Sequence, residues 1–474
     1  MLLVRKLVFY LFVVAYVVIC PLTIAYALGY LVRPGAEQGL VKTGLIYLST
    51  SPPGASVYVG RRRYTQRTPT SLRGVLPGTY PITVALKGHR VWKRRVAVEA
   101  GHATAFDHIL LLPDVLRQHV LVSDRCEELL ASTDAHLLVV RCGPLLRDLR
   151  LYHRREATLL PLRVPGVAWQ DARIREAVTM RDGAGLVLSV ASREGPRWVW
   201  VDAERAPEVF LDLTPLVPDP VAEIQWDPRE SHLLFVRSPD RLIRVDVERG
   251  TSTLVAAEAL RGVGMFRKWL YVVSREGTIE RRDAGGKTVE VVLDDPAARA
   301  LFQQGRFRVV VCDEDTIFFI GERGELLSTQ PPYLLLKHGV RDVAWDPLQE
   351  RLLVRQRERL GVLEPPDRGL PKDVLARPGI RWIFTDGSDL RQAFWVYDGS
   401  HVLIRDGEEV ALLERPIGDH PPVIQTLVRV QPRSDVRVVE PAGTLYYLDH
   451  PSGHLRALEV FPTHEVVTLP FREP

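Results

Sequence analysis

The stretch that decides the fold of most of this chain begins at Gln225. It reads Gln225-Trp226-Asp227-Pro228, and a short polar segment then leads to the apolar run His232-Leu233-Leu234-Phe235-Val236. A second copy reads Ala344-Trp345-Asp346-Pro347 and leads to Leu352-Leu353-Val354. In both copies a turn with a proline-fixed φ angle precedes an apolar run of strand length, a pattern that predicts the opening of a β-hairpin.

Four side chains define these turns. Asp227 and Asp346 each stand before a proline, and an aspartate at such a turn accepts hydrogen bonds from nearby backbone amides. Trp226 and Trp345 precede them, and we expect their large apolar surfaces to pack between neighbouring sheets. We therefore predict structural roles for all four residues and a catalytic role for neither aspartate.

Apolar runs of this kind recur along residues 114–474. Their spacing lies roughly in the forties, which is typical of β-propeller blades built from several strands each. The sequence predicts a propeller of seven or eight blades, with a pair of smaller β-sandwiches as the alternative fold. The Trp-Asp-Pro turns resemble those of WD40-like, TolB-like propellers of the bacterial envelope. The runs cover residues 136–140, 185–190, 232–236, 269–273, 316–320, 351–354, 393–397 and 444–448.

A different pattern occupies residues 44–113. Short apolar strands alternate there with turns rich in proline and glycine, which predicts a small β-sandwich of five or six strands. Its densest part is Ser51-Pro52-Pro53-Gly54-Ala55, followed by Val57-Tyr58-Val59-Gly60. The later motifs are Thr68-Pro69, Leu76-Pro77-Gly78-Thr79-Tyr80 and Lys87-Gly88-His89-Arg90-Val91-Trp92.

The order and spacing of these motifs resemble the PEGA domain family. Pro53 stands where the tetrapeptide that names the family has glutamate, a departure that affects surface chemistry more than fold. The resemblance implies an extracytoplasmic β-sandwich that acts as a spacer or adhesion module and has no enzymatic activity of its own. The motif residues with structural, turn-forming roles are Pro52, Pro53, Gly54, Ala55, Pro69, Pro77 and Gly78.

The same segment is strongly basic. Residues 44–112 hold ten Lys or Arg against Glu99 and Asp107, a net charge of +8 in a chain whose total is +4. Two runs, Arg61-Arg62-Arg63 and Lys93-Arg94-Arg95, are candidate contacts for an anion or an envelope polymer. A solvated surface is the alternative.

An uncharged segment, residues 7–32, follows Arg5 and Lys6 near the N-terminus. Its length suffices for a helix that crosses the hydrocarbon core, so we predict a transmembrane signal anchor, with residues 1–6 in the cytoplasm and residues 33–43 as a linker. Ala25-Tyr26-Ala27 leaves a cleavable signal peptide open. Both interpretations place the rest of the chain outside the cytoplasm.

The four cysteines have neither metal-ligand nor redox spacing. Cys126 and Cys142 form a disulfide in one interpretation of an exported domain, and are buried free thiols in the other. The sequence leaves this choice open.

No catalytic or cofactor motif is present in the sequence: it has no nucleophile elbow, zinc-protease helix, phosphate-binding glycine loop or EF-hand. Asp313-Glu314-Asp315 lacks the alternating ligands of a calcium loop, and His450 and His454 flank a hairpin turn. We therefore predict no enzyme activity, no metal and no cofactor.

Together these features predict an all-β protein anchored in the cell membrane, with its bulk outside the cytoplasm. We expect it to act as a binding or scaffolding module of the cell envelope, with the propeller as interaction platform and the PEGA-like domain as spacer. The alternative is an envelope enzyme, a lyase or hydrolase, with a site in the propeller channel. The expected partners are the membrane and an envelope protein or cell-surface glycan, not nucleic acid.

Overall fold

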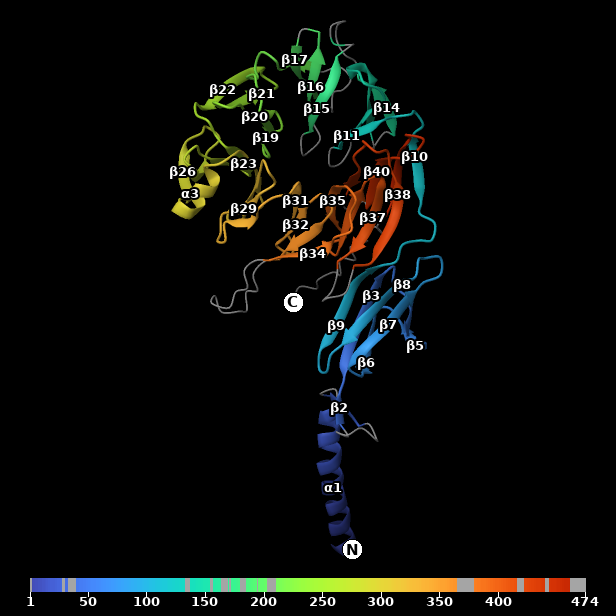
Figure 1. Ribbon diagram of the computed structural model, residues 1–474. Coiled ribbons are helices and arrows are strands. Elements are labelled where there is room, and N and C mark those ends of the chain that lie inside the picture. The colour runs from blue at the N-terminus through green and yellow to red at the C-terminus, as the bar shows by residue number, and fades with distance from the viewer. Residues whose placement is uncertain are drawn as a thin grey trace, which may run out of the picture. The chain divides into compact units, whose positions relative to one another are not determined.

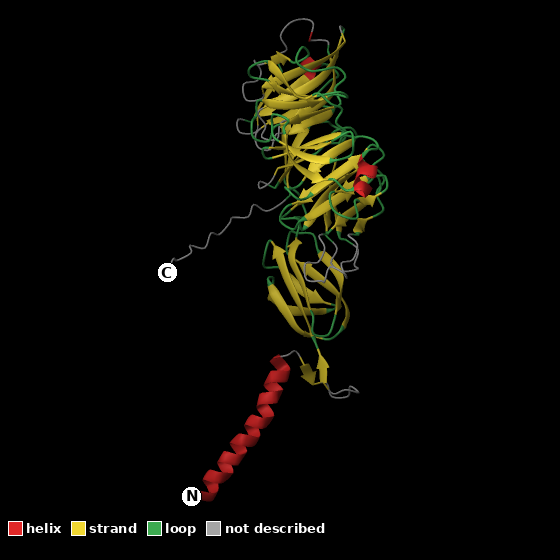
Figure 2. Cartoon of the chain, turned by 90° about the vertical axis from the view of Figure 1, so that its left-hand side faces the viewer, coloured by secondary structure: helices red, strands yellow, loops and turns green. Residues whose placement is uncertain are grey.

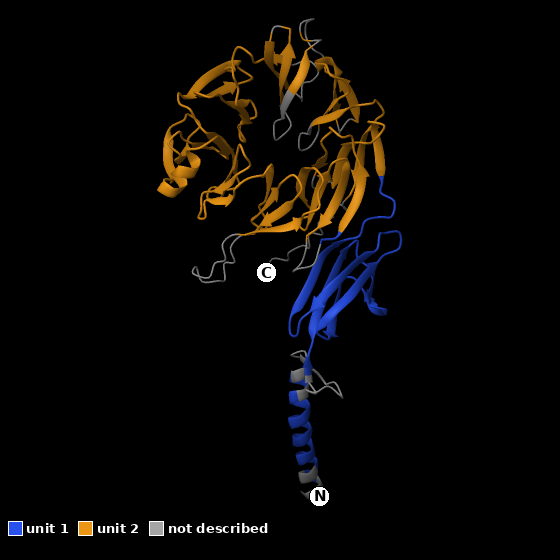
Figure 3. Ribbon diagram, viewed as in Figure 1, with its two compact units in different colours: residues 1–117, 416–423, 462–474 blue, residues 118–415, 424–461 orange. Residues whose placement is uncertain are grey.

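The chain divides into two compact units (Figure 3). The first comprises residues 1–117, 416–423 and 462–474, and the second comprises residues 118–415 and 424–461. The structure, a computed structural model, describes residues 2–27, 30–32, 40–132, 137–153, 157–162, 169, 172–179, 185–193, 195–202, 210–364, 379–415, 422–439 and 443–460.

The N-terminal segment is helical over α1 (Leu2–Ala27), with apolar side chains such as Phe12, 75% exposed, on its surface. The helix does not extend to residue 32 as predicted. Residues Tyr30–Val32 form β1, whose backbone pairs antiparallel with β2 (Leu40–Lys42) and so cannot continue a helix. Among the described residues, no helix has both the length and the apolar character needed to cross a membrane.

Residues 44–110 form a β-sandwich of two sheets, which Figure 2 shows as strands joined by short loops. The two sheets enclose one apolar core that includes Ile46, Val57, Trp92 and Phe106. The smaller sheet, in the order β6-β3-β9, contains β3 (Gly44–Ser51), β6 (Thr70–Val75) and β9 (Ala103–Leu110). The larger sheet, in the order β5-β4-β7-β8, contains β4 (Ser56–Val59), β5 (Arg62–Arg67), β7 (Gly78–Ala85) and β8 (Trp92–Val98).

The second unit consists of four-stranded antiparallel sheets arranged as a ring (Figure 1). Seven of the sheets described in this unit are meanders of four consecutive strands. The first three meanders are β11 (Glu128–Ser132), β12 (Leu137–Arg141), β13 (Leu149–His153) and β14 (Thr158–Pro161); β15 (Arg173–Thr179), β16 (Gly185–Ser192), β17 (Gly195–Asp202) and β18 (Phe210–Asp212); and β19 (Glu223–Trp226), β20 (Leu233–Arg237), β21 (Leu242–Asp246) and β22 (Thr251–Ala256).

The remaining four meanders follow in chain order, and a short helix, α3 (Pro296–Phe302), stands between the first two of them. They are β23 (Gly262–Phe266), β24 (Trp269–Val273), β25 (Ile279–Arg282) and β26 (Thr288–Leu293); β27 (Phe307–Val311), β28 (Ile317–Gly321), β29 (Leu326–Ser328) and β30 (Leu334–Leu336); β31 (Asp342–Asp346), β32 (Arg351–Arg355), β33 (Leu360–Leu363) and β34 (Ile380–Phe384); and β35 (Leu390–Val396), β36 (His401–Asp406), β37 (Glu409–Glu414) and β38 (Ile424–Arg429).

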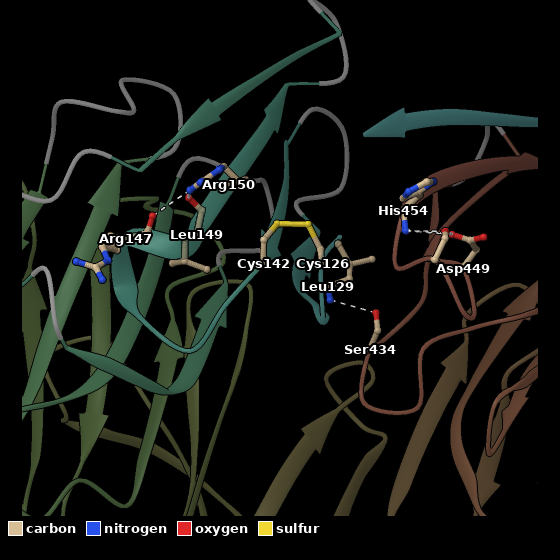
Figure 4. Close-up of a disulfide and its surroundings, with 10 residues drawn as sticks. Cys126, Leu129, Cys142, Arg147, Leu149, Arg150, Ser434, Asp449 and His454 are labelled. Atoms are coloured by element: carbon tan, nitrogen blue, oxygen red, sulfur yellow. Dashed lines mark hydrogen bonds between the residues drawn. A yellow bond between two sulfur atoms is a disulfide. The ribbon is translucent and has the colours of Figure 1, made fainter. Parts of the chain in front are cut away.

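An eighth sheet closes the ring with strands from both ends of the unit. Its order is β10-β41-β40-β39, formed by β10 (Gln118–Val122), β39 (Arg437–Val439), β40 (Thr444–Leu448) and β41 (Leu455–Glu459). The backbone amide of Leu129 in β11 also donates to Ser434 Oγ, at 3.1 Å, beside the Cys126–Cys142 disulfide (Figure 4). The described residues therefore form an eight-bladed β-propeller, and the alternative of two smaller sandwiches is wrong.

Alternate residues of one strand enter different cores. In β12, Leu137 and Val139 pack against the next sheet of the ring, whereas Leu138 and Val140 pack against the closing sheet. A sheet that is covered on both faces needs apolar residues at successive positions. This double burial explains why the second strands of the blades are continuous apolar runs.

Candidate functional site

The predicted cationic runs lie on the larger sandwich sheet, at its two edge strands. Arg61, Arg62 and Arg63 are exposed at the hairpin that opens β5, and Lys93 and Arg95 are exposed on β8. The register places Arg63 opposite Tyr58, Tyr58 opposite Thr83 and Thr83 opposite Lys93. Cations from both edges thus share one row across the sheet.

Arg94 does not belong to this exposed set. Burial alternates along β8, so Trp92, Arg94 and Val96 face the core while Lys93 and Arg95 face solvent. Arg94 is 6% exposed, and its guanidinium carbon lies 5.5 Å from the centroid of the Phe106 ring. Strand periodicity therefore removes Arg94 from the candidate surface contacts.

The exposed cations of this sheet have no acidic counterparts near them in the sequence. Residues 56–98 contain neither aspartate nor glutamate. The described sandwich contains ion pairs of His102 with Glu99 and of His108 with Asp107, and among its described residues no ion pair includes Arg61–Arg63, Lys93 or Arg95. The resulting surface carries uncompensated positive charge, which attracts anions.

The turn after β3 has the conformation that its motif requires. Pro52 and Pro53 follow the last residue of the strand, and Gly54 has φ of +90°, which favours glycine. Thr68 accepts a hydrogen bond from the Ala55 amide through its hydroxyl, at 2.9 Å. Of the other motif residues, Pro69 lies between β5 and β6, Pro77 precedes β7 and Gly78 begins it.

The Trp-Asp-Pro turns open the second strands of two blades. Asp227 Oδ1 accepts from the Arg229 amide at 2.9 Å, and Asp346 Oδ1 accepts from the Leu348 amide at 3.1 Å. Trp226 packs against the core between two neighbouring blades, and the Trp345 ring lies 6.3 Å from that of Phe318 on the preceding blade. The geometry at these residues is that of turn and inter-blade packing.

Sequence reasoning missed a row of arginines where the first strands of four consecutive blades begin. Arg308 on β27 donates to Asp342 Oδ1 of the next blade at 2.6 Å, and Arg355 lies 3.5 Å from Asp342 Oδ2. Arg341 in turn reaches Asp389 on the following blade, with Nη1 and Oδ1 3.1 Å apart. Ion pairs thus connect three successive blades along this end of the ring.

The row continues to the closing sheet. Arg357 and Arg391 also contact Asp389, with Arg391 Nε 2.9 Å from Oδ2. Arg405 donates to the Pro432 carbonyl at 2.7 Å and pairs with Asp435. We call this set the arginine rim: Arg308, Arg341, Arg355, Arg357, Arg391, Arg405 and Arg437, with Asp342, Asp389 and Asp435. The signal in the sequence was an arginine within two residues of each of these strand starts.

A model of the PEGA domain family matches residues 43–110. Residues 43–110 are a PEGA domain. The family resemblance of the sequence is thereby confirmed, over nearly the same range as predicted. No curated protein matches the chain.

The region after the PEGA domain matches WD40-type β-propellers among solved structures. Sqt1 of Saccharomyces cerevisiae aligns with 73% of this chain and 98% of its own, at 8% identity and a TM-score of 0.46. The Swd1 propeller of Myceliophteria thermophila aligns with 73% of this chain and 100% of its own, at 10% identity and a TM-score of 0.42. YCF48 bound to the D1 peptide aligns with 74% of this chain and 96% of its own, at 12% identity and a TM-score of 0.40.

The acidic run at Asp313 and the hairpin turn at His454 have structural roles. Asp313 Oδ1 accepts from the Asp315 and Thr316 amides, and Asp449 Oδ1 accepts from the His454 amide. In the part of the PEGA domain and propeller that the structure describes, no group of three or more His, Cys, Asp or Glu is placed to hold a metal. Burial raises the pKa of the Cys312 thiol to about 12, so this cysteine is a poor nucleophile at neutral pH.

Proposed function

We propose that this chain is a non-enzymatic binding and scaffolding module of the cell envelope, in which the propeller binds a protein partner and the PEGA domain is a spacer. The arginine rim is the observation that carries this proposal. It presents arginines from four consecutive blades at one end of their strands, and arginine is enriched at protein interfaces. A propeller provides a rigid frame on which such side chains hold their positions.

The PEGA domain contributes a second, separate contact in this proposal. Its exposed cations, Arg61–Arg63, Lys93 and Arg95, attract the phosphate or carboxylate groups of an anionic envelope polymer. Support comes from the absence of acidic residues between positions 56 and 98. The domain would then connect the propeller to the envelope through charge, without a dedicated pocket.

The proposed location is outside the cytoplasm. The Cys126–Cys142 disulfide supports it, because structural disulfides persist mainly in oxidising compartments. The measurement is thiol labelling of the protein in its native host, with and without prior reduction: two thiols, Cys20 and Cys312, are expected to react in the denatured protein before reduction, and four after it. Four reactive thiols before reduction would contradict the location. Residence at the cell membrane with a cytoplasmic N-terminus stays a prediction, which cell fractionation checks.

Site-specific crosslinking in intact cells tests the binding function. p-Benzoylphenylalanine replaces Glu358, an exposed residue of the rim loop between β32 and β33, in one full-length protein. In the control it replaces Leu348, which is 72% exposed at the other end of β32 in the same blade. We expect a discrete crosslinked product from position 358 only. Absence of any product from both positions would refute a partner-binding propeller.

A further inference from the structure

We propose that the arginine rim binds an acidic segment of a partner protein through the carboxylates of its Asp or Glu side chains. This inference rests on the proposed function and specifies the chemistry of the partner. The rim belongs to the blades formed by β27–β30, β31–β34 and β35–β38 and to the closing sheet.

The rim contains more positive than negative charge. Its seven arginines share three aspartates, so the network carries four more positive charges than negative charges. Two further arginines, Arg306 and Arg433, adjoin it in sequence, and the neighbouring acids Glu358 and Asp406 offset them. Asp406 already accepts from the Ser388 and Asp389 amides, which reduces its capacity to neutralise the arginines.

The excess is not present on every blade. On the blade of β19–β22, Arg237 pairs with Glu223 at 3.0 Å. At the same end of this blade, Arg241 pairs with Asp240 at 2.7 Å. At the corresponding end of this blade, carboxylates therefore match arginines, in contrast to the arginine rim.

The arginines lie in two layers. Arg357, Arg308, Arg341 and Arg391 have side chains that are 40% to 65% exposed. Arg405, with a side chain that is 1% exposed, and Arg355 lie behind them. Burial lowers the pKa of both buried guanidiniums, and the neighbouring charges of Arg341 and Arg391 lower it further. A bound anion would offset this crowding of like charges.

The existing contacts favour a carboxylate ligand. Asp389 alone is approached by Arg341, Arg357 and Arg391, with its two oxygens divided among them. Guanidinium groups bind carboxylates through directed N–H donors. The rim already arranges its arginines around three carboxylates of the chain itself. The carboxylates of an extended acidic peptide would contact the exposed arginines in the same way.

The test measures peptide binding to the full-length protein by fluorescence anisotropy. The probe is a labelled peptide of repeated Glu-Gly, and the matched peptide carries Gln in place of each Glu. The rim variant is Arg308→Gln/Arg341→Gln/Arg357→Gln. The control variant is Arg229→Gln/Arg249→Gln/Arg267→Gln, which removes three exposed arginines from loops at the other ends of the strands. Arg357→Glu is tested alone, since this side chain is 65% exposed and its replacement should leave the fold intact.

We expect Kd for the Glu peptide to rise by about tenfold or more in the rim variant and in Arg357→Glu, and by less than about twofold in the control variant. Affinity should fall with salt less steeply in the rim variant, because fewer charges contribute. Equal losses in rim and control variants, or equal binding of the Gln peptide, would overturn the inference. So would binding of inorganic polyphosphate without binding of the Glu peptide.

Crosslinking separates this inference from the proposed function. If the product formed at position 358 persists in the rim variant, the propeller binds a partner but the acidic-segment chemistry is wrong. If the wild-type protein gives no product at position 358, the proposed function itself fails, whatever the peptide measurements show.

Discussion

Asp346 and Arg351 form a buried ion pair within one blade, with Asp346 Oδ2 and Arg351 Nη2 2.6 Å apart and side chains that are 4% and 5% exposed. Arg351 also donates to the Gly399 carbonyl on the next blade, at 2.9 Å, and its guanidinium carbon lies 4.7 Å from the Trp395 ring centroid. The aspartate of the Trp-Asp-Pro turn therefore organises its own turn through Oδ1 and a contact between blades through Oδ2.

Replacing Asp346 should destabilise the propeller strongly. Asp346→Ala leaves the buried Arg351 charge without its partner, which costs about 3–5 kcal/mol in the free energy of unfolding. Urea denaturation followed by tryptophan fluorescence measures the loss. The control is Asp240→Ala, which removes a solvent-exposed partner of Arg241 and should not change stability measurably. Equal stability of the two variants would contradict a structural role for the buried pair.

Removing the disulfide should also lower stability. Cys126 and Cys142 are 16 residues apart in sequence, and in the chain-entropy model a loop of this size contributes about 3 kcal/mol by restricting the unfolded chain. We expect Cys126→Ala/Cys142→Ala to unfold at lower urea concentration and to become insensitive to reductant. Cys312→Ala, in which the disulfide remains, is the control. Unchanged stability in the double variant would show that the bond contributes nothing to the fold.

Alkylation of Cys312 should be slow and steeply pH-dependent. Burial, together with a smaller contribution from the neighbouring Asp313 charge, raises the pKa of this thiol from 9.0 to about 12. At pH 9 only about one thousandth of the folded thiol is ionised. In a Cys20→Ser protein, the iodoacetamide rate should rise about tenfold per pH unit from pH 8 to 10 and increase sharply on unfolding. A rate that levels off near pH 9 would contradict the raised pKa.

The raised pKa of Cys312 also makes the stability of the protein depend on pH. The thiol of the unfolded chain ionises near pH 9, whereas that of the folded chain stays protonated until about pH 12. Deprotonation therefore favours the unfolded chain, and the contribution of Cys312, complete below pH 9, is lost as the pH rises toward 12. Cys312→Ala should lose less stability across this interval than the wild-type protein.

Adjacent arginines of the PEGA domain should respond differently to substitution. Arg95 is exposed, so Arg95→Gln should lower the salt concentration that elutes the full-length protein from immobilised heparin, with little effect on stability. Arg94 packs beside Phe106 in the core, so Arg94→Gln should lower the melting temperature instead. Equal elution and equal stability of the two variants would contradict the alternating burial along β8.

Much of the fold could be predicted because its signals are local. The motifs of the PEGA domain are turns, and turns can be recognised in a sequence because their backbone geometry restricts the residue type. Gly54, with φ of +90°, is an example. Seven of the eight apolar runs coincide with the second strand of a blade, and the run at 393–397 instead overlaps the first strand, β35. Ala393 and Trp395 of this strand pack against the core that it shares with the preceding blade.

The candidate site was harder to predict. Arg94 was grouped with Lys93 and Arg95 because a run of charged residues does not show which face of a strand each side chain occupies. Successive side chains of β8 point to opposite faces of the sheet. The pairing of Cys126 with Cys142 was likewise left open, and the fold brings them together across the start of the first blade.

The sequence by itself determined the repeat, the turn chemistry and the domain order, because these depend on residues close together in the chain. Tertiary structure alone decided that β10 completes the sheet of β39–β41, and that Arg308, Arg341 and Arg391 lie along one rim. These contacts join blades whose residues are tens or hundreds of positions apart. Local pattern contains no information on such pairings, because they arise only when the packing of neighbouring sheets bends the chain into a ring.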